Sequence, residues 1–134
     1  MPGVHPTDNP SNVKSYVDVN AATTPIPLYH YVMRDNSVKN GVALYDGNGV
    51  PLGVNYGPIK AGSEAVNIRL CGGGGTYIIT AGGAIADGAV VTAAATGRVT
   101  ARAAETTSQG VKDSEGTSAD GDQIEVVDNP QEGL

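Results

Sequence analysis

Three side chains of the kinds that bind zinc or act in catalysis stand far apart in the sequence. They are His5, His30 and Cys71, and their spacings match no known ligand pattern. A zinc site needs three or four such ligands at characteristic short spacings. Neither histidine lies in a context that suggests a base for Ser63 or Cys71 as a nucleophile. We therefore expect no metal site, no cofactor and no nucleophilic catalysis.

A group of acidic residues could in principle bind a hard cation. Asp113, Glu115, Asp120 and Asp122 lie within ten residues of one another. An EF-hand loop needs a glycine at its sixth position and a glutamate at its twelfth, and no register of this segment supplies both. Nothing apolar nearby would raise a carboxyl pKa for acid catalysis. We interpret the segment as a solvated acidic loop, and the chain as a protein without enzymatic activity.

A run of four glycines, 72–75, invites comparison with a phosphate-binding loop. Such a loop precedes a helix and ends in Gly-Lys-Ser/Thr. Here the run is followed by Thr76-Tyr77-Ile78-Ile79, which is typical of a strand. This context excludes dinucleotide binding, and the glycines are expected to form a flexible or closely packed connection.

The overall charge and hydropathy narrow the class of protein further. Fourteen acidic residues against eight basic ones give a net charge of −6, so we expect no nucleic-acid partner. The first 30 residues do not resemble a secretion signal, and no apolar run approaches the ~20 residues of a membrane span. One cysteine cannot form an internal disulfide. We expect a soluble protein, made in the cytoplasm and without a membrane partner.

The residues that would form a core favour strands. The chain has no Trp and no Phe, and its aliphatic residues are mostly β-branched, with 16 Val and 7 Ile against 5 Leu and 2 Met. Short apolar runs bounded by Gly, Asn or Asp occur at 28–33, 41–46, 50–55, 65–70, 76–80, 89–92, 98–102 and 123–127. The pattern predicts a mainly β protein, a small compact sandwich or barrel. Asp46-Gly47-Asn48-Gly49 predicts a hairpin, and Thr96-Gly97 a second turn.

Before these runs lies a segment with a different composition. Residues 1–27 hold five of the eight prolines, which predicts an extended N-terminal arm. Its apolar residues would be exposed on a free arm, so they are candidates for docking onto a partner: Val13, Tyr16, Val17, Pro25, Ile26 and Pro27. The alternative is a short strand packed on its own domain. The β-rich domain is expected at 28–127, with an acidic loop at about 105–120, followed by a C-terminal tail at 128–134.

One segment resembles a known family. In residues 80–101, TAGGAIADGAVVTAAATGRVTA, the positions of Gly82, Gly83, Ile85, Gly88 and Gly97 are similar to the pattern of the small capsid cement or head decoration proteins of tailed bacteriophages. Ile124 and Val126 stand in a closing G-x-x-I-E-V segment that is also similar. The family often has a short strand where this chain has an acidic insertion, at 108–119. The sequence therefore does not decide whether a strand forms around Gly110-Val111.

The resemblance implies a β-tulip-like fold and a structural role in the virion. Such proteins bind the outside of the mature capsid, where they cement neighbouring major capsid protein subunits and often form trimers. The expected partners are the major capsid protein and other copies of this chain. An alternative is a host-surface- or carbohydrate-binding β module on the virion or tail. The same glycine-rich element at residues 82–88 could also occur in a small β-sandwich of any other kind.

Overall fold

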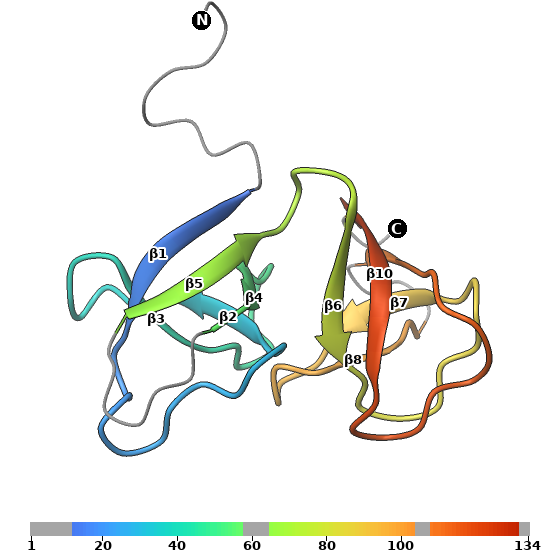
Figure 1. Cartoon of the computed structure of the whole chain (residues 1–134), viewed down its shortest axis with the longest axis horizontal. Coiled ribbons are helices and arrows are strands. Elements are labelled where there is room, and N and C mark those ends of the chain that lie inside the picture. The colour runs from blue at the N-terminus through green and yellow to red at the C-terminus, as the bar shows by residue number, and fades with distance from the viewer. Residues whose placement is uncertain (1–11, 58–64, 104–107, 132–134) are drawn as a thin grey trace, which may run out of the picture.

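Over the residues described, the chain folds into ten strands and contains no helix. The computed structural model describes residues 12–57, 65–103 and 108–131. The strands fall into two groups that follow one another along the chain, a barrel and a second sheet (Figure 1). The sequence-based expectation of a mainly β fold with barrel character is confirmed.

The first group is a closed five-stranded barrel. Its strands are β1 (Val13–Asp18), β2 (Tyr31–Arg34), β3 (Gly41–Leu44), β4 (Gly53–Asn55) and β5 (Ala65–Leu70), in the order β1-β3-β2-β4-β5. The ladder between β1 and β3 is parallel, and the other ladders, including the one between β1 and β5 that closes the barrel, are antiparallel. Because the barrel is closed, none of its strands has a free edge that could pair with another chain.

The second group is a five-stranded sheet that curls back on itself. It contains β6 (Thr76–Thr80), β7 (Val90–Ala93), β8 (Val99–Ala101), β9 (Ser108–Lys112) and β10 (Gln123–Gln131), in the order β6-β10-β9-β7-β8. Its two edge strands approach each other at an isolated bridge between Ala81 and Val99. The Gly82 N–H donates to the Val99 carbonyl there, at 2.7 Å.

The two groups share one hydrophobic core. Tyr31, Tyr45 and Val54 of the barrel half pack with the buried side chains of the second sheet, which are Tyr77, Ile79, Ala81, Ile85, Val91, Val99, Ile124 and Val126. A second cluster fills the barrel and contains Tyr16, Ile26, Val32, Val42, Val66 and Ile68. Alternation along the strands sends most of these residues inward, whereas Ile26, Tyr45, Ala81 and Ile85 lie in the connections between strands.

The turn at Asp46–Gly49 differs from the hairpin that its sequence predicts. Gly47 and Gly49 do adopt positive φ, at 94° and 72°. However, β3 and β4 do not pair with each other, because both pair with β2, which lies between them. The turn thus carries the chain across the end of β2. The turn at Gly97, with φ of 76°, does join a direct hairpin between β7 and β8.

The expected domain boundaries also differ from the structure. Residues 13–18 form a barrel strand instead of part of a free arm, as the alternative interpretation allowed; residues 1–11 lie outside the described part. The strand expected at 123–127 runs on to Gln131, so the residues 128–131 assigned to the tail belong to the sheet. Residues 108–112, inside the expected acidic loop, form β9, and the acidic loop that follows spans 113–122.

Candidate functional site

The six candidate docking residues of the N-terminal segment divide into buried and exposed ones. Tyr16 and Ile26 fill the barrel core and are only 5% and 3% exposed. Val13 and Val17 are half-buried in β1, whereas Pro25 and Pro27 are exposed. In this structure, therefore, Tyr16 and Ile26 contribute to the chain's own core, and the two prolines remain open to a partner.

A buried carboxylate holds this proline-containing segment in place. Asp18 accepts hydrogen bonds from the backbone N–H groups of Asn20, at 3.0 Å, and Ile26, at 2.9 Å. The buried Asn55 side chain adds a bond from its Nδ2 to the Ile26 carbonyl, at 2.9 Å. These polar partners explain why a segment with an arm-like composition is folded onto the barrel. In the sequence, the one local signal of these hydrogen bonds is an Asp placed directly after a short run that alternates apolar and polar residues.

The residues that carry the family resemblance lie in the second sheet and the loop before β7. Ile85, Ile124 and Val126 are core residues. Gly88 adopts a positive φ of 82°, and Gly97 is buried, where a Cβ would meet the Leu44 side chain at 2.5 Å. Gly82 lies close to Thr100, while a Cβ on Gly83 would meet nothing within 4 Å. Apart from Gly83, these positions have a direct structural reason for their residue type.

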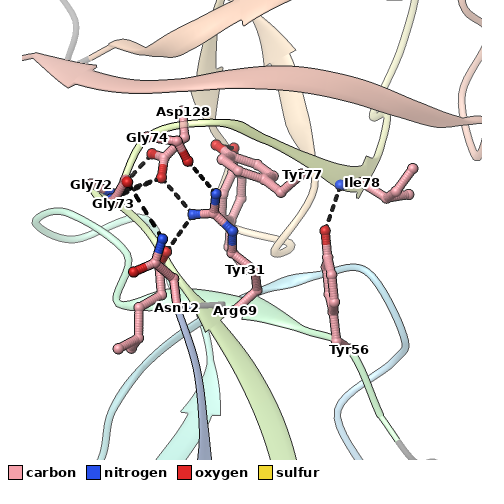
Figure 2. Close-up of polar contacts among 11 residues, drawn as sticks. Asn12, Tyr31, Tyr56, Arg69, Gly72, Gly73, Gly74, Tyr77, Ile78 and Asp128 are labelled. Atoms are coloured by element: carbon pink, nitrogen blue, oxygen red, sulfur yellow. Dashed lines mark hydrogen bonds and ion pairs between the residues drawn. The ribbon is translucent and has the colours of Figure 1, made fainter. Parts of the chain in front are cut away.

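A polar joint connects the barrel to the second sheet at the four-glycine segment (Figure 2). Asp128 of β10 accepts a hydrogen bond from Arg69 Nη1 of β5, at 2.5 Å, and this ion pair is buried, with side-chain exposures of 0% and 7%. The same carboxylate accepts the backbone N–H groups of Gly72 and Gly73, at 2.8 and 3.0 Å. Arg69 also donates to the Gly74 carbonyl. The glycine segment therefore binds a carboxylate of its own chain through backbone N–H groups.

Tyrosines extend this joint on the other side of Arg69. The Arg69 guanidinium lies 5.5 Å from the centre of the Tyr77 ring. The hydroxyls of Tyr31 on β2 and Tyr77 on β6 share a hydrogen bond of 2.7 Å, and the Ile78 N–H donates to the Tyr56 hydroxyl, at 2.8 Å. Burial raises the pKa of both Tyr31 and Tyr77 well above the ordinary value. The joint is therefore neutral overall, and, in the described part of the chain, none of the buried side-chain atoms without a hydrogen-bond partner belongs to it, as expected of a structural element.

Cys71 lies beside this joint and shows no sign of reactivity. Burial, and secondarily the negative charge of Asp128, raises the pKa of its thiol to about 12. A thiolate is the reactive form of cysteine, and it would be scarce near neutral pH. Cys71 has the character of a packed, inert side chain.

A shallow hollow of about 380 Å³ lies between the two halves, on Pro27, His30, Gly82, Thr96, Arg98, Thr100 and Asp120. His30 Nδ1 lies 2.9 Å from the Leu28 carbonyl, which can only accept, so Nδ1 carries the proton and Nε2 faces Arg98 Nε at 3.5 Å. Arg98 in turn forms a 2.7 Å ion pair with Asp120. Burial, together with the charge of Arg98, lowers the pKa of His30. The hollow contains no nucleophile paired with a base.

The described residues also lack two features that would point to other classes of protein. Among them, no group of three or more His, Cys, Asp or Glu side chains is placed to hold a metal ion. They also include no helix long and apolar enough to cross a membrane. The acidic side chains of the 113–122 loop are exposed; Asp120 pairs with Arg98, and Asp122 accepts a hydrogen bond from the Ala119 N–H.

Comparison with known proteins finds similarity at the level of structure. No protein-family model matches the chain, and neither does any curated protein sequence. The fold is similar to the crystal structure of the head fiber gp8.5 N base in bacteriophage phi29, with a TM-score of 0.68 and 16% sequence identity. The match covers 91% of this chain and 98% of that one. At this identity, the two chains share a fold.

Proposed function

We propose that this chain is a structural protein of a phage virion, bound to the outer surface of the mature capsid, where it cements neighbouring major capsid protein subunits. The observation that carries the proposal is the fold shared with a phage head fiber base over nearly the whole of both chains. The resemblance of residues 80–127 to head decoration proteins supports the same role independently, because it rests on sequence.

The architecture suits a mechanical role. A closed barrel and a curled sheet share one core and one buried ion pair, so force applied to one half is transmitted to the other through packed and bonded groups. We further propose that the chain acts without enzymatic activity or cofactor, and binds neither nucleic acid nor membrane. Its partners are the major capsid protein and other copies of itself, most simply as a trimer on the shell. It is made in the host cytoplasm and ends on the capsid exterior.

Quantitative mass spectrometry of density-banded particles tests the location and abundance. We expect this chain at a ratio of one copy per one or few copies of the major capsid protein. A handful of copies per particle would favour the alternative, a host-surface- or carbohydrate-binding module on the virion or tail. Absence from the particles would refute a structural role.

The cementing role needs a separate experiment. Particles that lack the chain should lose their DNA at a lower temperature than complete particles, because a ligand of the expanded shell stabilises it by mass action. Adding back the purified chain should restore the release temperature in a saturable manner. If the added chain bound the particles without changing the release temperature, it would attach to the capsid but would not cement it.

A further inference from the structure

The outer face of the second sheet carries a row of exposed valines. Val127 of β10 lies opposite Val111 of β9, and Val111 lies opposite Val90 of β7. The three side chains are 38%, 36% and 40% exposed, although their neighbours Val126 and Val91 are fully buried. Cross-strand partners on one face are in contact. The row is therefore one continuous apolar strip across three strands.

Carboxylates accompany this strip. Glu125 stands two residues before Val127 and Asp113 two residues after Val111, so both belong to the same face in the next row. The Asp113 N–H donates to the Glu125 carbonyl, at 2.9 Å, which places these residues side by side. Over the described residues 76–131, seven acidic residues stand against three basic ones. We call Val90, Val111, Val127, Glu125 and Asp113 the valine face.

The barrel half presents a surface of the opposite charge. The loop between β2 and β3 exposes Val38, 43% accessible, and Lys39. Next to it, Arg34 and Lys14 flank the Tyr16 ring, with their charged groups 5.7 and 5.4 Å from its centre. Within the described part of the chain, none of these three cations is within 4.0 Å of a carboxylate, whereas Arg69 and Arg98 are each paired.

The one acid of this loop does not cancel its charge. Hydrogen bonds from the Ser37 side chain and from the Ser37 N–H, the latter at 2.9 Å, lower the pKa of the Asp35 carboxyl, so Asp35 is negative. Three cations still stand against this one carboxylate, which leaves an excess of positive charge around an exposed valine. We call Lys14, Arg34, Val38 and Lys39 the basic end. It belongs to the barrel, whereas the valine face belongs to the second sheet at the other end of the long axis (Figure 1).

We propose that the valine face binds the basic end of a second copy of this chain. Val38 of one copy packs on the valine strip of the next, while Lys14, Arg34 and Lys39 approach Glu125 and Asp113. The contact joins two different surfaces, so it is heterologous and generates a ring when the rotation closes. The inference rests on the self-association included in the proposed function and deepens it, because it names the two surfaces and the head-to-tail arrangement.

A charge exchange tests this contact in the full-length chain. In analytical ultracentrifugation, the variant K14E/R34E and the variant D113K/E125K should each associate at least tenfold more weakly than the unmodified chain. The chain that carries all four substitutions should recover association. An equimolar mixture of the two variants should form mixed pairs but no closed trimer, because a ring of three would contain one contact between like charges. Association of the unmodified chain should weaken toward about 1 M salt, where the Debye length is ~3 Å.

The apolar part of the contact has its own variant and control. Val111→Ser should weaken association, because it removes apolar area from the middle of the strip. Val50→Ser changes a valine that is 54% exposed on the loop between β3 and β4, and it should leave association unchanged. Thermal unfolding of each variant checks that the fold is retained, because the substituted side chains are exposed or, at Glu125, half-buried.

The outcomes separate this inference from the proposed function. If the charge variants associate as the unmodified chain does, or if that chain stays monomeric at every concentration and on particles, the inference is overturned. Cross-links from the valine face to the major capsid protein, instead of to another copy, overturn it as well. If the chain still binds capsids in any of those cases, the proposed function stands. If the chain is absent from particles, the proposed function is wrong, but the contact between two copies is not.

Discussion

Asp128 is a buried carboxylate whose partners come from a segment more than fifty residues earlier in the chain. It binds Arg69 and two glycine N–H groups, so its charge is compensated by groups that all donate. Breaking a buried pair by removing one charge is costly because the other charge stays buried alone. The exposed pair of Arg98 and Asp120 should contribute little to stability, because water screens it; Asp120 is 69% accessible.

The substitution Asp128→Asn should therefore lower the free energy of unfolding by about 3–5 kcal/mol. The new amide would also direct N–H donors at Arg69 or at the glycine N–H groups. The matched control Asp120→Asn should cost at most about 1 kcal/mol. Denaturant titration of both variants measures the difference, and equal effects of the two substitutions would contradict the role assigned to the joint.

His30 predicts how stability responds to mild acid. Its pKa is lowered from 6.5 by burial and by Arg98, so the unfolded chain binds a proton more readily than the folded one. Stability from this residue is complete above about pH 6.5 and declines as the pH falls toward the lowered pKa. Denaturation at a series of pH values should show this decline, and His30→Gln should flatten it. A slope unchanged by the substitution would remove His30 as the cause.

At the scale of elements, much of the strand pattern could be predicted from the sequence, because burial on alternate positions is a local signal. The runs 65–70 and 76–80 coincide with β5 and β6. Pairing between distant strands leaves no such signal, so neither the closure of β1 on β5 nor the passage of β2 between β3 and β4 could be derived. The end of β10 was missed for a related reason: Asp128-Asn129-Pro130 is typical of a strand's end unless a distant arginine compensates the acid.

The candidate site was harder to predict than the strands. Tyr16 and Ile26 have the composition expected of a docking arm, but it is Asp18 and Asn55 that decide whether the segment folds back. The valine strip depends on the register of three strands, two of them joined through an acidic segment. Such a surface emerges only when the ladder is known.

The pairing of β9 with β10 leads to a prediction about a single glycine. Gly110 has a φ of 141°, and a Cβ there would lie 1.7 Å from the Val127 carbonyl oxygen. Gly110→Ala should separate the two strands and cost about 2–4 kcal/mol in unfolding free energy. Gly83→Ala is the matched control, since its Cβ would meet nothing within 4 Å; we expect a change within about 0.5 kcal/mol. Equal stability of the two variants in thermal and denaturant unfolding would contradict the register described here.

At the scale of the whole molecule, the two halves should unfold together. The larger core cluster takes Tyr31, Tyr45 and Val54 from the barrel half and the remaining side chains from the second sheet, and the Arg69–Asp128 pair adds a polar link. Separating the halves would expose the shared apolar surface and a buried charge pair at once. The barrel also has its own cluster around Val32 and Val42, but both halves would lose packing on separation, which favours one cooperative transition.

Native-state hydrogen exchange measures this directly. The slowest amides of β5, in the barrel, and of β10, in the second sheet, should report the same free energy of opening within about 1 kcal/mol, because both exchange only on global unfolding. In Asp128→Asn, both sets should lose protection by the same amount. If instead the barrel amides kept their protection while those of β10 lost it, the halves would be independent units. The chain would then be two modules joined by a hinge, and force on one half would not be carried to the other through the shared core.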